Sequence, residues 1–191
     1  MRRFLPIILI GLIFLFIPMI ASAQPKPAYG GSLAIAQGVE PPGLDPTTAT
    51  SAAIPRVVYS NVLEGLLKID RNGRVVTALA QDYKFTRDGK TYTFLLKKGV
   101  TFHDGKPFDA EDVKFTLERL MDPKTGTAHP EYYKDIESVQ KMDKYTVRIK
   151  LKNANSMFLF NLARPDSVIV KKEAADGGAR PAGRRGAGGK R

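Results

Sequence analysis

Residues 96–113 read LKKGVTFHDGKPFDAEDV, and the order of turn and helix signals in this stretch decides the fold. Asp104 and Gly105 stand between two short segments that each contain a phenylalanine, residues 100–102 and 106–108. An Asp-Gly pair in this position predicts a tight turn. Asp109 follows at once, and an aspartate directly before a helix caps its free backbone N–H groups. The stretch therefore predicts a turn followed by a capped helix.

The predicted helix begins at Ala110 and carries Glu111 and Asp112 in its first turn, where carboxylates meet the positive end of the helix dipole. Its apolar residues recur at helical spacing, and they are Val113, Leu117, Leu120 and Met121. Residues 122–126, Asp-Pro-Lys-Thr-Gly, end the helical pattern. The helix is therefore expected to bury one face.

Alternating patterns on both sides of this stretch predict antiparallel strands. Residues 82–86 and 91–96 are two alternating aromatic runs, and the Asp-Gly pair within residues 87–90 predicts a hairpin between them. Residues 145–151 alternate apolar with polar side chains, which is typical of a half-buried antiparallel strand.

The outer parts of the chain give weaker signals. Residues 32–36 predict a buried first strand, and residues 40–46, with three prolines and a glycine, predict a stiff loop after it. Residues 51–67 have the apolar spacing of an amphipathic helix. Further on, residues 155–163 predict a short helix and residues 168–170 a final strand.

Four segments carry a resemblance to a known family. They are residues 30–33 with 44–46, residues 62–67 followed by 79–80, residues 88–94, and residues 96–113. Together they resemble the N-terminal part of the family 5 extracellular solute-binding proteins, the periplasmic peptide- and oligopeptide-binding components of ABC transporters. The resemblance covers roughly residues 30–173.

This resemblance implies an α/β fold of the type II periplasmic-binding-protein kind, in which two lobes close over a ligand by hinge motion. Members of the family are considerably longer than this chain. Residues 24–176 are therefore expected to form an incomplete domain, the N-terminal part of lobe I only, with a mixed sheet and hairpins. The second lobe, the hinge strands and most of the ligand cleft are expected to be absent, which would make the chain an N-terminal fragment.

The start of the chain has the order of a secretory signal. Arg2 and Arg3 precede an apolar run over residues 4–20, and the small residues Ala-Ser-Ala follow. This pattern predicts a signal peptide over residues 1–23, cleaved after Ala23, and hence a periplasmic product. The alternative is a retained membrane anchor, because the run is nearly long enough to span a bilayer. The chain has no cysteine, which excludes disulfides, cysteine-ligated metal and a lipidated cysteine.

The formal net charge of +11 gathers partly at the two ends of the chain. Residues 177–191 contain only glycine, alanine, proline, arginine and lysine, so they cannot enter a core. They also lack the aromatic residues on which nucleic-acid bases stack. We therefore expect no nucleic-acid partner, and a tail that is disordered or the product of a frameshift.

Candidate ligand-binding residues come from the proline-rich loop and from one aromatic loop. The resemblance implies that the loop holding Glu40, Pro41 and Pro42 approaches the ligand, and ligands of open α/β sheets bind beyond the carboxyl ends of strands. Glu40 could pair with the amino terminus of a peptide or be a solvated loop acid. Tyr132 or Tyr133 could wall the same cleft or pack on the fold.

Catalytic and metal chemistry have little support in the sequence. His103 and Asp104 could act as an acid/base pair in a secreted hydrolase, but an Asp-Gly turn explains them better, and no nucleophile motif occurs. His103 and His129 without cysteine make a poor transition-metal site. We expect no catalytic residue, no metal and no cofactor.

The sequence thus favours a non-enzymatic, monomeric protein that binds a solute, with a peptide as the leading class, for ABC-type import. Its expected partners are the small-molecule or peptide solute and a permease in the inner membrane. Two alternatives stay open: a non-functional truncated product and a secreted hydrolase.

Overall fold

The computed structural model describes residues 30–32 and 34–171. The predicted signal peptide and the basic tail lie outside the described residues. The chain divides into two units, residues 1–36 and 37–191, and every helix and strand described below belongs to the second. The helices are α2 (Ala53–Val58), α3 (Ala110–Met121) and α4 (Phe158–Leu162). The strands are β1 (Leu67–Ile69), β2 (Val75–Thr77), β3 (Ala80–Phe85), β4 (Thr91–Leu96), β5 (Ile136–Asp143) and β6 (Thr146–Leu151).

The main sheet has four antiparallel strands in the order β3-β4-β6-β5. Phe94 in β4 sits between Tyr83 and Val147 of the neighbouring strands. Alternate residues of β4 and β6 are buried, as the alternating sequence pattern predicts. The hairpin over residues 82–96 and the strand over 145–151 are confirmed.

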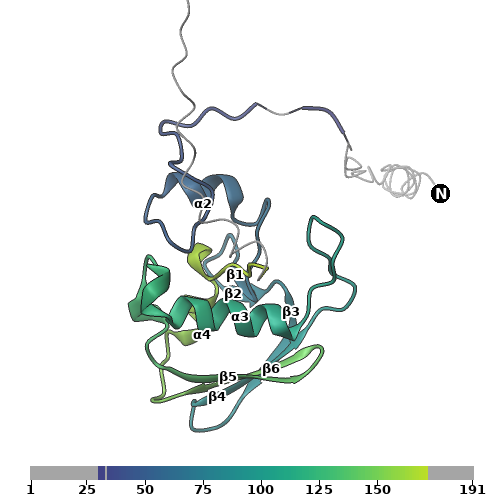
Figure 1. Ribbon diagram of the computed structural model, residues 1–191, viewed down its shortest axis with the longest axis vertical. Helices are drawn as coiled ribbons and strands as arrows, with labels where there is room; N and C mark the ends of the chain where they lie inside the picture. Colours follow the sequence, from purple (N-terminus) through teal and green to yellow (C-terminus); the bar gives the residue numbers. More distant parts are fainter. Residues whose placement is uncertain (1–29, 33, 172–191) are drawn as a thin grey trace, which may run out of the picture. The chain divides into compact units, whose positions relative to one another are not determined.

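Helix α3 lies across one face of this sheet and packs on β5 and β6 (Figure 1). Its residues Val113, Leu117 and Leu120 are buried in the same cluster as Phe94, whereas Met121 is half-buried at the margin. Deleting one such buried side chain costs about 2–5 kcal/mol, so this helix-on-sheet layer makes a large contribution to stability.

The start of α3 has the predicted geometry. One carboxylate oxygen of Asp109 accepts a hydrogen bond of 2.7 Å from the backbone N–H of Glu111, and the backbone N–H of Asp109 donates to Asp112 at 2.9 Å. This is a reciprocal capping box. The preceding turn is also confirmed, because the N–H of Gly105 donates to the carbonyl of Phe102 at 2.9 Å.

The helix predicted over residues 51–67 is wrong beyond Val58. Ser60 has a φ of 61°, in the left-handed region, and the chain then becomes extended. Gly65 pairs with Val168 in an isolated antiparallel bridge, and the N–H of Ile169 donates to the carbonyl of Glu64 at 2.8 Å. Pairing with a segment a hundred residues away therefore replaces the helical hydrogen bonds that local spacing favours.

Residues 67–77 form a hairpin, β1 with β2, whose two strands the sequence pattern did not indicate. Strand β5 was also not predicted, and its edge is irregular, with register shifts near both ends. The helix predicted over residues 155–163 is shorter and spans Phe158–Leu162. The final strand predicted at residues 168–170 is reduced to the isolated bridge at Val168.

The buried first strand predicted at residues 32–36 is wrong for the part that the structure describes. Residues 34–36 are exposed and irregular, and the side chain of Ile35 is 73% exposed. A short apolar run becomes a strand only where a neighbour supplies backbone hydrogen bonds, and the two described sheets consist of β1 to β6 alone.

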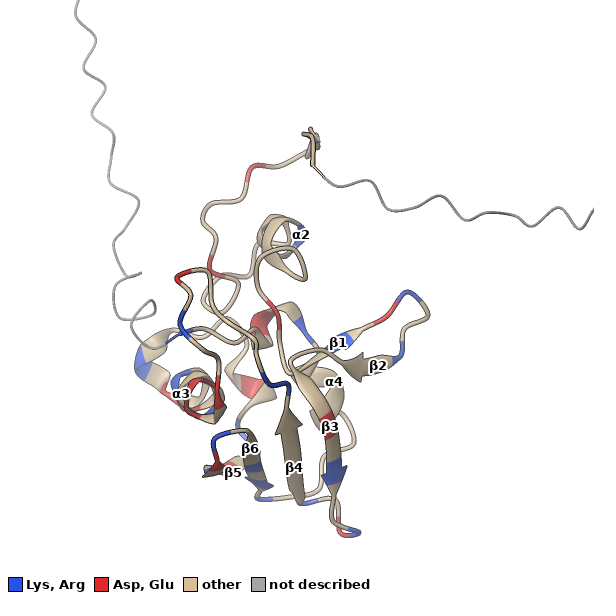
Figure 2. Ribbon diagram, turned by 90° about the vertical axis from the view of Figure 1, so that its right-hand side faces the viewer, with Lys and Arg blue, Asp and Glu red and all other residues tan. Residues whose placement is uncertain are grey.

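The α/β class with hairpins is confirmed by this arrangement of helices and sheets. Pairing within both described sheets is antiparallel, and among the described residues the parallel pairing is an isolated bridge between Tyr59 and Leu63. Figure 2 shows basic and acidic residues interspersed over both sheets and their turns. No helix within the described ranges is long and apolar enough to cross a membrane.

Candidate functional site

The loop over residues 45–52 is fastened to helix α3 by its first residues. One carboxylate oxygen of Asp45 accepts hydrogen bonds from the backbone N–H of Thr47 at 2.8 Å and from its hydroxyl at 2.6 Å. Arg119, in the last turn of α3, donates to that hydroxyl oxygen at 2.8 Å and lies 3.5 Å from the other oxygen of Asp45. The N–H of Ala128 donates to the carbonyl of Thr47 at 3.0 Å. The loop therefore has a fixed place on the domain.

A facing wall is built around the ring of Tyr132. The imidazole of His129 stacks on this ring with the centroids 5.0 Å apart, and the guanidinium of Arg164 lies 4.4 Å from the ring centroid. His129 also pairs through Nδ1 with Glu131 at 3.1 Å. Stacking on an aromatic ring orients a planar guanidinium and costs it little hydration. Tyr132 thus holds two side chains that come from segments far apart in the sequence.

Asp166 anchors Arg164 from the interior. Its carboxylate is 7% exposed, and Oδ1 accepts from Nε of Arg164 at 3.3 Å. The hydroxyl of Tyr133 lies 3.4 Å from Oδ2 of Asp166 and 2.8 Å from the hydroxyl oxygen of Ser167, which itself donates to the carbonyl of Asn161. Burial, and then the nearby charge of Asp166, raise the pKa of Tyr133, so its hydroxyl stays protonated and available as a donor.

A cavity of about 190 Å³ lies between the loop and this wall. The loop contributes Pro46 and residues 49–52, and the wall contributes His129 and residues 164–166. Ligand pockets for whole drug-sized molecules are roughly 300–1,000 Å³, so this cavity is large enough for one part of a small ligand. The arrangement can bind polar groups reversibly.

The residues predicted from the proline-rich loop lie apart from this cavity lining. Glu40 and Pro42 are exposed and Pro41 is half-buried. Tyr132 is half-buried and supports the cavity wall through His129 and Arg164, without lining the cavity itself. A ligand contact by any of the four stays a prediction.

Sequence reasoning missed Arg164 altogether and considered His129 only as a metal ligand. The available signal was the Arg-Pro-Asp sequence directly after an apolar helix, which places opposite charges two residues apart. Nothing in the local pattern places that loop beside residue 129. Within the described ranges, no three His, Cys, Asp or Glu side chains gather closely enough to share a metal ion.

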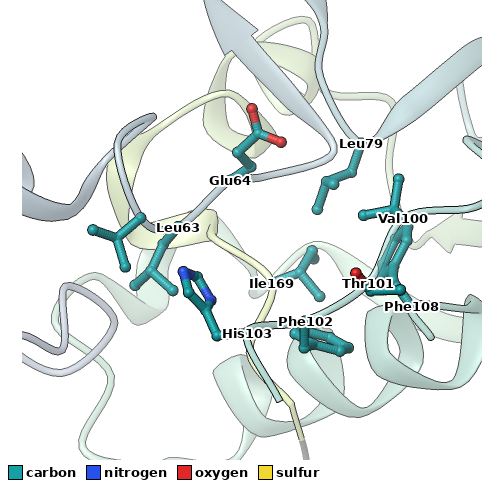
Figure 3. Close-up of a pocket in the computed structure, with 10 residues that line it drawn as sticks. Leu63, Glu64, Leu79, Val100, Thr101, Phe102, His103, Phe108 and Ile169 are labelled. Atoms are coloured by element: carbon teal, nitrogen blue, oxygen red, sulfur yellow. The ribbon is translucent and has the colours of Figure 1, made fainter. Parts of the chain in front are cut away.

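His103 lines a different cavity, of about 100 Å³ and mostly apolar. Figure 3 shows its imidazole facing Leu63, with the carboxylate of Glu64 pointing away from it. Asp104 does not orient the imidazole, because its two oxygens accept from the N–H of Lys106 and from the side chain of Lys171. Asp104 and His103 therefore form a turn, and the acid/base pair of the hydrolase hypothesis is not assembled among the described residues.

Comparison with known proteins assigns the family. The profile of the bacterial extracellular solute-binding proteins, family 5 Middle, matches residues 74–188, which is more than half of the chain. The chain belongs to this family. The family resemblance that the sequence shows at the Asp-Gly turn and the capped helix is thus confirmed, because the matched residues include every element from β2 to α4.

Relatives in this family carry names that describe bound solutes. The glutathione-binding protein GsiB of Pectobacterium atrosepticum is 35% identical over 140 residues, which cover 73% of this chain and 27% of that protein. The di/tripeptide-binding protein 1 of Pseudomonas aeruginosa is 33% identical over 174 residues, which cover 82% of this chain and 32% of that protein.

Solved structures agree with the fold. The binding protein AgaA of A. tumefaciens, in complex with agropinic acid, aligns with a TM-score of 0.69 at 30% identity, over 75% of this chain and 29% of that one. Haemophilus influenzae OppA, in complex with a peptide, aligns with a TM-score of 0.67 at 25% identity, over 73% and 30% of the two chains. The chain spans about a quarter to a third of the length of these relatives.

Proposed function

We propose that this chain takes part in capturing a small solute, a peptide by chemical class, outside the cytoplasm for an ATP-driven importer. The cavity between the Asp45 loop and the Arg164 wall is the observation that carries the proposal. Its walls are fixed by hydrogen bonds and ring contacts, and they present polar side chains to the cavity. Pre-organised polar groups of this kind bind ligands without a chemical step.

The names of the relatives support a peptide. Glutathione and di- or tripeptides combine backbone amides with charged ends, and a cavity with a guanidinium, an imidazole and a hydroxyl at its walls can hydrogen-bond to such groups. Glu40, Pro41, Pro42 and Tyr132 are proposed as contacts of parts of the ligand that extend beyond the cavity. An inner-membrane permease is the proposed protein partner, and the chain acts as a monomer.

The proposed location is the periplasm. The basic start, apolar run and small residues of positions 1–23 support export by a signal peptide that is removed after Ala23. Intact-mass measurement on protein recovered from the periplasm of an expressing bacterium tests this step. A product beginning at Gln24 is expected, and a membrane-bound product that keeps its first residues would favour the anchor.

Thermal melting of the purified protein, expressed from its complete reading frame, tests solute binding. A pool of di- and tripeptides is expected to raise the melting temperature progressively with concentration, because a ligand that binds the folded state stabilises it. Ala49→Trp should abolish the shift, since Ala49 lines the cavity and an indole would fill it. Thr48→Trp, at the exposed neighbouring position, should keep it.

Two outcomes would contradict the proposal. A cooperative melt that no peptide shifts would exclude peptide capture by this chain. A melt without cooperativity would favour a non-functional product, whose sheet leaves β3 and β5 as edge strands open to non-specific pairing.

A further inference from the structure

The side chain of Arg164 offers hydrogen-bond donors to a ligand at the wall of the cavity. Asp166 is the acid in its wall, and its carboxylate faces Arg164 on one side and Tyr133 on the other. Arg164 uses Nε for Asp166, and no other described residue hydrogen-bonds to its Nη1 or Nη2. His129 uses Nδ1 for Glu131. The two Nη groups of Arg164 and Nε2 of His129 are therefore open to a ligand.

Arg164 is also held in one orientation before any ligand arrives. The ring of Tyr132 lies 4.4 Å from the guanidinium carbon, and the buried carboxylate of Asp166 fixes the Nε edge. A guanidinium has five N–H donors in a rigid fork, and one of its edges matches the two oxygens of a carboxylate. Fixing the fork in advance lowers the entropy that a bidentate contact would otherwise cost.

We infer that Arg164 is the residue that selects for a carboxylate group on the ligand. The inference rests on the proposed function, because it concerns the same cavity and names the chemical feature of the solute that this cavity recognises. Asp166 and Tyr132 are positioning residues, which act on the ligand only through Arg164. For a peptide, the selected group is a terminal or side-chain carboxylate.

Calorimetric titration of the full chain with trialanine and with trialanine amide tests this assignment. The amide has the same length and amino terminus but lacks the carboxylate, so it is expected to bind about tenfold more weakly or worse, as charge-assisted bidentate pairs are the strong ones. Arg164→Gln should weaken trialanine to the level of the amide and leave the amide unchanged. Arg71→Gln, in the exposed turn between β1 and β2, should change neither.

Arg164→Lys is the control for a folding defect in Arg164→Gln. A lysine keeps the positive charge that faces Asp166 but lacks the planar fork of the guanidinium. This variant is expected to melt near the parent temperature and to discriminate acid from amide less than the parent does. Equal affinity of the parent for acid and amide overturns the inference and leaves the proposed function standing. Unchanged discrimination in both Arg164 variants also overturns it. Absence of binding by either peptide overturns the proposed function, and the inference with it.

Discussion

Nη1 of Arg119 donates a hydrogen bond of 2.8 Å to the hydroxyl oxygen of Thr47, although the two residues are 72 positions apart in the sequence. Thr47 has no solvent exposure, and its hydroxyl donates a hydrogen bond of 2.6 Å to the carboxylate of Asp45. The Asp45-Pro46 segment that carries part of the family resemblance is thereby tied to the end of the capped helix. The loop wall of the cavity is therefore held in place by helix α3, which packs on the main sheet.

Thr47→Val should lower the free energy of unfolding by about 1–3 kcal/mol, because Arg119 and Asp45 lose their shared partner while the shape is kept. Chemical denaturation measures this change. Thr48→Val, at the exposed next position, is the matched control and should stay within about 0.5 kcal/mol of the parent. Equal effects of the two substitutions would show that the hydrogen bonds of Thr47 contribute nothing.

The part of the fold around the second Asp-Gly turn could be predicted because its determinants are local. The turn, the cap at Asp109 and the alternation of β4 and β6 all depend on neighbours a few residues away, and each of these predictions is confirmed. The helix over residues 51–67 failed because its second half pairs with residues 168–169. Apolar spacing predicts which residues are buried, but it does not predict which distant segment packs against them.

The residues that form the cavity could not be predicted from local sequence patterns. His129 and Arg164 meet on the ring of Tyr132, and no pattern within either segment indicates that meeting. Tyr132 was singled out from its loop position, yet its contacts are with protein side chains. The loop of Glu40 was chosen from the family resemblance, and whether it reaches a ligand stays a prediction.

Gly65→Ala should destabilise the protein because a Cβ at this position would meet backbone that cannot move aside. It would lie 3.1 Å from the carbonyl oxygen of Leu67 and 3.2 Å from that of Ser167. Forcing an extra methyl group into a packed interior costs typically about 1–3 kcal/mol, and that loss is expected in urea denaturation. Gly43→Ala is the control, since no atom lies within 4 Å of its added Cβ. A loss as large in the control would show that the close contacts at Gly65 do not cause the effect.

Asp109→Ala should remove the cap of α3 and cost about 0.5–2 kcal/mol. The reason is that the backbone N–H groups at the start of the helix lose the carboxylate of Asp109 as their acceptor. Glu118→Ala is the comparison on the same helix, where an exposed pair with Lys114 is lost instead. That pair is worth at most about 0.5 kcal/mol. A ranking in which Glu118→Ala is the more harmful change would contradict the capping assignment.

Asp104 makes the stability of the protein depend on acid pH through its contacts in the turn. The side chain of Lys171 donates to its carboxylate, the N–H of Lys106 donates at 3.1 Å, and these hydrogen bonds hold the pKa of Asp104 below its ordinary value of 3.8. A carboxyl whose pKa is lower in the folded state than in the unfolded state stabilises the fold at every pH above the unfolded value. That contribution is lost as the pH falls through the folded-state pKa.

Asp104→Asn isolates this contribution, because asparagine keeps the acceptor for the N–H of Lys106 and is compatible with the turn, but it carries no charge for Lys171. The difference in unfolding free energy between parent and variant should be constant above about pH 5 and should shrink progressively below about pH 4. Asp88, Glu131 and Asp143 also have lowered pKa values, from hydrogen bonds of their own, so both proteins should lose stability in acid. Only the difference between the two curves reports on Asp104, and a difference that stays the same down to about pH 2 would show that Lys171 does not stabilise its charged form.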